Sequence, residues 1–345
     1  MSRKTAKVAL MLPKASSGSI GTARARRLVA LALSFVLAAC GGEQRPSPVS
    51  PTTPSVPMPP STLALVSGET GEPVGGATVV IGGQNLRADS QGQVGVPGGS
   101  ALGTFVDLVS PAFLDRQTVL REGSGPLRLS LWPRMTPSGM DENFTATLVY
   151  TSTVDGALVG GQALRRHRPS VTAVYLALSA ALRADSESVA WHQLAADSIN
   201  VAVGGKVVYQ LSTAPPAGAV VVDASYDPSN AGCAGGSRGF ASLRLSAGEI
   251  LGGTIVYCAA DAPRSPTVVH ELGHSFGLFH SPDRSDLMYF SFVRGRSEVF
   301  TAKETLAMRL MLDRPSGTRY PDNDRSTSGA AVRGQDGLVE IRCSG

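Results

Sequence analysis

Two patterns of apolar and polar positions divide the chain. Up to about residue 131, short apolar runs are separated by turns rich in glycine, and the turns recur every ten residues or so. The apolar runs are residues 63–66, 77–81, 93–96, 105–109 and 127–131. Short strands with regularly spaced turn signals are typical of a small β-sandwich. We therefore predict an all-β sandwich over residues 63–132.

Beyond residue 140 the pattern alternates between strand and helix signals. Residues 185–203 carry apolar side chains at helical spacing, and further helices are expected over 267–279 and after Thr301, which forms a capping-box pattern with Glu304. The expected strands are 171–177, 207–211, 219–222 and 254–258. This order predicts an α/β (α+β) domain over residues 140–345, in which a long helix supports a twisted mixed sheet.

The N-terminus has the pattern of an export signal. A basic region ends at Arg27, and the apolar stretch 28–39 that follows is too short to span a bilayer, which takes roughly 20 residues. The stretch ends in Leu-Ala-Ala-Cys-Gly at residues 37–41, which resembles the lipobox of bacterial lipoprotein signals. The resemblance implies a signal peptide over 1–39 and lipidation of Cys40. The alternative is an ordinary signal peptide in which Cys40 has no role.

Between this signal and the first strands lies a linker, residues 40–62, with seven prolines. Such a composition favours extended polyproline conformations, so the linker is expected to be a semi-rigid stalk. The predicted sandwich that follows the linker loosely resembles the carboxypeptidase-regulatory-like family. Residues 71–81 and 89–92 carry this resemblance. That resemblance implies no chemistry, and we expect a spacer role.

The charge pattern argues against nucleic acid as a partner. The formal net charge is +4, but residues 1–39 hold seven basic residues and no acidic one, so subtracting their seven charges leaves −3. A mildly acidic mature protein does not favour binding to nucleic acid.

The expected partners are a protein or peptide substrate, and the membrane through a lipid anchor only. We expect the cell envelope, and favour the outer membrane because Gly41 is not the aspartate associated with inner-membrane retention.

Three cysteines remain after Cys40. An exported protein is in an oxidising compartment, where a pair of cysteines usually closes a disulfide. Three cysteines allow three pairings. We favour Cys233 with Cys258, because they belong to one domain, and expect Cys343 to stay unpaired.

The chemistry is concentrated between residues 270 and 280. His270 and His274 share a helix face at spacing i, i+4, and Glu271 projects to the adjacent side of the same turn. Gly277 can take the positive φ that ends a helix, which lets His280 return as a third ligand. Three histidines and a water form the open tetrahedral pattern of catalytic zinc. We predict zinc at these histidines, with Glu271 as general base.

The segment His-Glu-x-x-His-x-x-Gly-x-x-His, with a methionine turn at Met288, resembles the metzincin signature and within that clan the matrixins. The resemblance implies a zinc endopeptidase in which Met288 forms an apolar floor beneath the metal. It also implies that residues 253–257 form the exposed edge strand that binds an extended peptide, and that residues 290–292 line the pocket beside the metal. The Pro-Arg-Cys-Gly switch of matrixins is absent from the sequence.

Two alternatives differ in class from a general endopeptidase. One is a surface binding or adhesin lipoprotein that keeps the fold without turnover, although all four positions of the motif are intact. The other is a zinc hydrolase that acts on cell-wall peptides. The remaining histidines carry no ligand spacing: His167 lies in a basic run, 165–168, that we expect to be a solvated loop, and His192 lies on the first helix.

Overall fold

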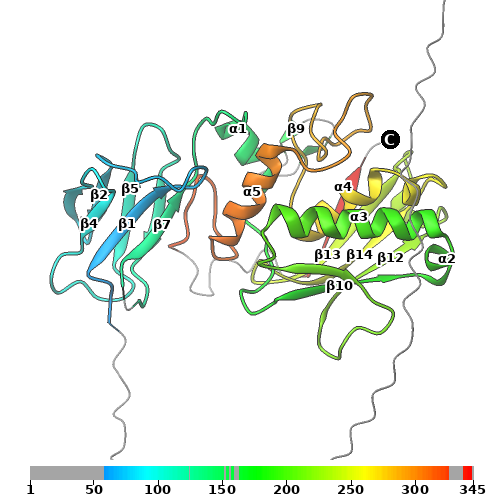
Figure 1. The fold of residues 1–345 in the computed structure, drawn as a ribbon, viewed down its shortest axis with the longest axis horizontal. Helices are drawn as coiled ribbons and strands as arrows, with labels where there is room; N and C mark the ends of the chain where they lie inside the picture. The colour runs from blue at the N-terminus through cyan, green and yellow to red at the C-terminus, as the bar shows by residue number, and fades with distance from the viewer. Residues whose placement is uncertain are drawn as a thin grey trace, which may run out of the picture. The chain divides into compact units, whose positions relative to one another are not determined.

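The computed structural model describes residues 58–123, 125–150, 163–325 and 337–343, and the backbone of a short hairpin formed by β8 (Thr153–Val154) and β9 (Ala157–Leu158) (Figure 1). The predicted signal peptide, Cys40 and all but the end of the stalk lie outside these residues. The described residues belong to one compact unit, Ser55–Gly345.

The N-terminal part consists of two small all-β sheets. One has the order β4-β1-β7, and the other has the order β3-β2-β5-β6. The first contains β1 (Thr62–Ser67), β4 (Gln93–Gly95) and β7 (Leu127–Leu131). The second contains β2 (Thr78–Ile81), β3 (Gln84–Arg87), β5 (Phe105–Val109) and β6 (Arg116–Val119). Apolar side chains of both sheets share one buried core, which is why alternate positions of these strands are apolar.

The second part is built on a six-stranded sheet with the order β11-β10-β12-β14-β13-β15. Its strands are β10 (Ala173–Leu178), β11 (Val208–Leu211), β12 (Val220–Tyr226), β13 (Gly239–Ser246), β14 (Glu249–Tyr257) and β15 (Gly337–Cys343). The first four in the order are parallel, while β13 is antiparallel to both of its neighbours. The predicted mixed sheet is confirmed.

Three main helices complete this part. The longest, α3 (Ser186–Ala202), begins where the Asp185 side chain accepts hydrogen bonds from two backbone N–H groups, and it runs alongside the sheet (Figure 1). The others are α4 (Thr267–Phe276) and α5 (Ala302–Leu312). Shorter turns are α1 (Glu142–Thr145), α2 (Ala180–Arg183), η1 (Ala146–Tyr150), η2 (Ala231–Cys233) and η3 (Ala262–Arg264). Helices and sheet bury a common apolar core.

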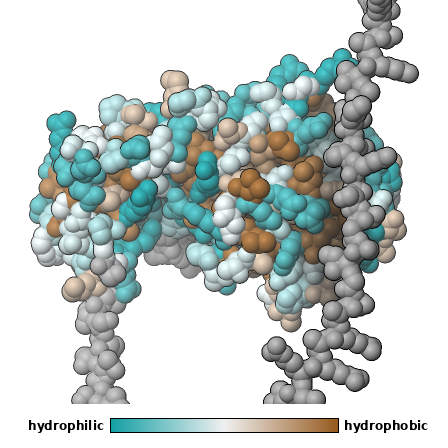
Figure 2. Space-filling view, viewed as in Figure 1, coloured by the Kyte–Doolittle hydropathy of each residue, from teal (hydrophilic) through white to brown (hydrophobic). Residues whose placement is uncertain are grey.

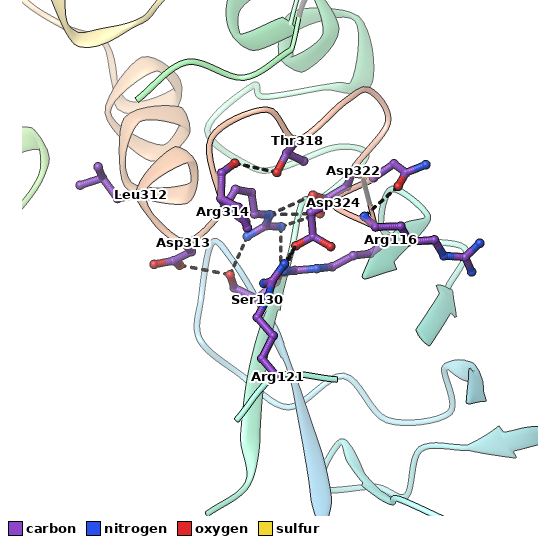
Figure 3. A network of polar contacts seen from close by, with 12 residues as sticks. Arg116, Arg121, Ser130, Leu312, Asp313, Arg314, Thr318, Asp322 and Asp324 are labelled. Carbon is purple, nitrogen blue, oxygen red and sulfur yellow. Dashed lines mark hydrogen bonds and ion pairs between the residues drawn. The ribbon is translucent and has the colours of Figure 1, made fainter. Parts of the chain in front are cut away.

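A buried polar network joins the N-terminal sheets to the segment after α5 (Figure 3). Arg314 and Asp322 are both fully buried and form an ion pair, with Nη2 and Oδ2 2.7 Å apart. Arg314 also donates to the carbonyl oxygen of Ser130, at 2.7 Å, and Arg116 donates to the same oxygen at 2.8 Å. Because an unpaired buried charge costs about 3–5 kcal/mol, loss of either partner would strongly destabilise this junction.

Three strands of the mixed sheet, β13, β14 and β15, differ from the sequence expectation. The expectation that residues 253–257 form an exposed edge strand is wrong, because β14 lies between β12 and β13. β13 precedes β14 in a hairpin that turns at Ala247 and Gly248, and both residues have positive φ. β13 therefore separates β14 from the outermost strand, β15. The sequence patterns had identified neither β13 nor β15.

Apolar side chains also reach the surface. Figure 2 shows scattered apolar patches between polar ones on the face that carries α3, whose exposed large apolar residues are Leu194 and Val201. Single exposed apolar residues are normal on a soluble surface. In the part of the chain that is described, every helix is too short or too polar to cross a membrane.

Candidate metal centre

Helix α4 carries the first two histidines, and its abrupt end positions the third. Gly277 ends the helix with φ of 116°, a value that side chains rarely permit. A Cβ atom at this glycine would lie 2.6 Å from the Arg165 carbonyl oxygen, so the close approach also requires glycine. After the turn, the Phe279 N–H donates to the Leu148 carbonyl at 2.7 Å. This hydrogen bond anchors the chain immediately before His280.

The three histidines meet at one point together with a cysteine. Potential ligand atoms of His270, His274, His280 and Cys343 all lie within 4.8 Å of one another. His270 Nε2 and His274 Nε2 are 3.1 Å apart. The Cys343 Sγ lies 3.1, 3.4 and 3.5 Å from the Nε2 atoms of the three histidines in chain order. All four residues are buried.

Backbone carbonyls orient two of these rings. His270 Nδ1 donates to the Leu287 carbonyl at 2.7 Å, and His274 Nδ1 donates to the Leu278 carbonyl at 2.8 Å. Each bond fixes the tautomer that leaves Nε2 with a lone pair, which is the arrangement expected of a metal-binding histidine. Burial lowers the pKa of His274 to about 4 and that of His270 further, so both rings are neutral at pH 7. Neutral imidazoles with converging Nε2 atoms fit a divalent metal ion.

Met288 packs directly against the metal-binding helix. Its side chain is fully buried, and a Cβ atom placed on Gly273 would lie 2.5 Å from its sulfur. The Ser281 N–H donates to the Met288 carbonyl at 2.7 Å, which ties the methionine turn to the residue after His280. Met288 thus lies under the turn of α4 between His270 and His274.

Glu304 secures the methionine turn from α5. One of its carboxylate oxygens accepts from the Met288 N–H at 2.7 Å, and the other accepts from the Thr301 N–H at 2.7 Å. The capping box predicted for Thr301 and Glu304 is present. Burial raises the pKa of Glu304 to about 7. Sequence reasoning missed its second contact, because a capping box by itself indicates only where a helix begins.

Glu271 lies beside the cluster in a buried position. Its side chain is fully buried, and apart from the adjacent Cys343 thiol its oxygens have no hydrogen-bond partner among the described residues. Burial raises its pKa to about 8, while Cys343 and Arg296 act in the opposite direction. A Cβ atom at Gly239 would lie 2.9 Å from the Glu271 Oε1, so the first residue of β13 must be small. A buried carboxylate next to three imidazoles can exchange protons near neutral pH.

The structure describes three of the four cysteines. Cys233 and Cys258 form a disulfide that links η2 to the end of β14, with Cα atoms 5.4 Å apart. Cys343 is free, as the sequence expectation had it, but it lies at the histidines, where we expected a water. Cys40 lies outside the described residues. No local pattern could have found Cys343, because β15 brings it to the site from 63 residues beyond His280.

The remaining histidines do not contribute to the cluster. The expectation of a solvated loop around His167 is wrong: His167 is buried and hydrogen-bonded to the Tyr209 hydroxyl at 2.8 Å. Arg165 is also buried, with its guanidinium 4.1 Å from the centre of the Phe279 ring. Residues 165–167 are inside because the aliphatic stems and guanidinium planes of the arginines pack on an aromatic ring and backbone carbonyls, whereas Arg168 is exposed. His192 is buried, and its Nε2 accepts from the Tyr257 hydroxyl at 2.9 Å.

The aromatic residues after the methionine turn differ in position. The Phe290 ring packs edge-on to His280, with ring centres 6.5 Å apart. Phe292 is half-exposed and lies between the guanidinium groups of Arg238 and Arg296. Only Phe290 therefore touches the metal-binding cluster.

Comparison with known proteins agrees with this geometry over one segment. Residues 260–305 match the family model described as matrixin. The matched segment contains α4, the three histidines, Glu271 and Met288. No match to a curated protein was found for the chain. The buried three-histidine cluster and the matched segment together fit a metal site of the kind that matrixins contain.

Proposed function

We propose that this protein is a zinc-dependent endopeptidase in which His270, His274 and His280 hold the metal and Glu271 is the general base. The observation that carries the proposal is the convergence of three buried imidazoles beside a buried carboxylate. A site built for structure alone would have no need of the carboxylate. The likeness of residues 260–305 to matrixins supports the same reaction class.

When bound between the histidines, a zinc ion would polarise the scissile carbonyl and lower the pKa of an attacking water to about 7. The chain's own residues supply the remaining steps. Glu271 accepts a proton from the water and passes it to the leaving amine. Its raised pKa suits both transfers near neutral pH. The Leu287 and Leu278 carbonyls hold the imidazoles of His270 and His274 in their ligand tautomers.

Separating ligand from base tests the proposal. Glu271→Ala should retain about one zinc per chain, while peptide hydrolysis falls by about 10²–10⁴-fold, because proton transfer is lost and metal binding is not. His274→Ala should lose the metal, because two imidazoles are a poor site for zinc. Metal analysis and cleavage of a broad peptide library measure both. Full activity of Glu271→Ala would refute the assignment of the base.

The same library separates the rival functions. Cleavage of general peptides supports an endopeptidase, whereas cleavage confined to cell-wall peptides indicates a specialised hydrolase. A zinc-loaded protein that cleaves neither, with or without Cys343, would instead be a binding module. Each result is informative only with measured zinc content, so that failure to load the metal is recognised.

We further propose that the chain is exported and held at the cell envelope by lipid on Cys40, with the N-terminal sheets as a spacer. Support comes from the lipobox-like residues 37–41 and the proline-rich linker. Cys40→Ser should abolish labelling by a fatty-acid analogue and release the protein from membranes. Cys343→Ser is the matched control, and it should be labelled like the unmodified protein. Persistent labelling of Cys40→Ser would exclude the anchor.

A further inference from the structure

The metal-binding cluster contains a fourth potential ligand that the proposed function does not use. Cys343 lies at the end of β15, and its sulfur faces all three histidines. Each Nε2–Sγ separation is between 3.1 and 3.5 Å. Ligand atoms that share one ion at about 2.0–2.3 Å lie roughly 3.3–3.8 Å apart in a tetrahedron. The three sulfur–nitrogen separations are therefore close to those of ligand atoms that share a single ion.

Strand pairing and a side-chain hydrogen bond fix the backbone position of Cys343. β15 pairs with β13 along its whole length, from Leu245 opposite Gly337 to Gly239 opposite Cys343. The Ser237 hydroxyl donates to the Cys343 carbonyl at 2.7 Å. Ile341 is buried, and these contacts leave Cys343 little freedom to move away from the histidines while the pairing lasts.

β15 also occupies the position that an extended substrate would need. β13 is the strand beside which β15 forms the end of the sheet. An extended peptide binds a sheet by adding to such a strand through main-chain hydrogen bonds, with alternate side chains in pockets. In this protein, β15 pairs with β13 in this way, and its Val339 packs against the apolar group of Leu243, Leu245 and Ile250. A substrate cannot pair with β13 until β15 leaves.

The consequence is a closed site. Glu271 and His274 are fully buried and Cys343 is almost so. The Cys343 thiol also lies beside the Glu271 carboxylate, and the two groups interact electrostatically. A water or a peptide carbonyl would therefore have to displace the same side chain from the ligand cluster and from the general base.

We propose that residues 337–343 are a built-in inhibitor, with Cys343 as the fourth metal ligand in the resting protein and β15 in the substrate's place on β13. The inhibitory part rests on the proposed peptidase function. As the sulfur–metal bond forms, the thiol proton passes to solvent; when the bond breaks, the sulfur takes up a proton and a water takes its place. The site opens only when the segment leaves β13.

Cobalt substitution tests the fourth ligand without any assay of activity. In the full-length chain loaded with Co²⁺, the unmodified protein should show a thiolate-to-metal charge-transfer band in the near ultraviolet. Cys343→Ser and Cys343→Ala should lose this band and keep about one metal ion per chain. Leu338→Ser, on the exposed side of the same strand, is the matched control and should keep the band. Absence of the band from the unmodified protein would overturn the proposal.

Thiol reactivity supplies a second readout. Alkylation of Cys343 by iodoacetamide, followed by mass spectrometry of its peptide, should be at least ~10-fold slower in zinc-loaded protein than after removal of the metal by a chelator. Equal rates in both forms would place the thiol outside the coordination sphere and overturn the proposal.

Activity then separates inhibition from a permanent structural ligand. Cys343→Ser should cleave peptides at least ~10-fold faster than the unmodified protein. If it loses its metal, the site is a closed Cys-His₃ structural centre and the inhibitor is refuted. If the band is present but both proteins cleave equally, inhibition is refuted while the peptidase stands. If the band is present and neither cleaves, the fourth ligand stands and the proposed peptidase function fails.

Discussion

All five histidines of this chain are buried, yet they divide into two regions with different chemistry. His167 and His192 each direct a ring nitrogen at a tyrosine hydroxyl, at 2.8 and 2.9 Å. In the other region, His270, His274 and His280 direct their Nε2 atoms at one another and at a thiol. Burial is common to both regions, so it does not distinguish them.

What distinguishes the regions is the partner of each Nε2 atom. A tyrosine hydroxyl is the hydrogen-bond partner of each of the first two Nε2 atoms, so these two histidines have no requirement for an ion. In the cluster, three Nε2 atoms converge on one another, and the Nδ1 atoms of His270 and His274 donate outward to backbone carbonyls. Only a cation or protons can stabilise such an arrangement.

The largest expected effect is a difference in zinc affinity between variants of the two regions. His270→Asn should weaken zinc binding by more than about 100-fold, since even the removal of partners outside the ligand set costs about 10–100-fold. His192→Asn, an equally buried residue, should leave zinc affinity within a few-fold of the unmodified protein. Competition with a coloured chelator measures both, and circular dichroism verifies folding. Equal losses in the two variants would contradict the distinction.

A smaller effect concerns the pH dependence of the tyrosine-bonded region. Burial lowers the pKa of His167 in the folded state to about 4 from its ordinary 6.5. As pH falls below 6.5, the unfolded chain therefore takes up a proton first, and stability that is complete above 6.5 is lost progressively down to pH 4. The loss between pH 7.5 and 5 should be about 2 kcal/mol.

The matched variant isolates this contribution. Other buried groups titrate in the same range: His270 and His274 act in the same direction as His167, whereas Glu271 and Glu304, whose pKa values are raised, act in the opposite direction. Urea unfolding of metal-free His167→Gln at both pH values should therefore show a loss about 2 kcal/mol smaller than in the unmodified protein. An identical pH dependence would mean that His167 is not neutral in the folded state.

The smallest expected effect concerns packing beneath the cluster. Gly273→Ala should be destabilising by about 1 kcal/mol, because overpacking costs about 1–3 kcal/mol and the better helix propensity of alanine returns about 1. The added methyl group would meet the Met288 sulfur. In a Met288→Ala background the same substitution should stabilise the helix. Absence of coupling between the two sites in unfolding experiments would show that Met288 does not pack there.

How much of this structure the sequence predicts depends on how far apart in the sequence the contacting residues lie. The ligand histidines lie within eleven residues, so helix periodicity and one glycine suffice to bring them together. β15 is different, because its pairing with β13 is decided by register and burial far from either strand in sequence. The same limitation hid Arg165, whose charge indicates solvent while its packing on Phe279 is tertiary.

The strands were likewise predicted only where a local pattern of residues identified them. Most of the parallel strands were predictable because each is a compact apolar run. β13 was missed although Ser242 and Arg244 alternate with apolar residues, which is itself a strand pattern, because the prediction relied on continuous apolar runs. With β13 and β15 unrecognised, β14 was placed at the edge of the sheet, although both of these strands lie outside it. The error therefore came from the missing neighbour.

The most direct test of the central claim is X-ray absorption at the zinc edge of the full-length protein containing one zinc per chain. The account predicts three imidazole nitrogens at about 2.0 Å and one sulfur at about 2.3 Å. In Cys343→Ser the sulfur should be replaced by oxygen while the three imidazoles remain. A zinc shell without three imidazoles would contradict the assignment of His270, His274 and His280 as the metal site.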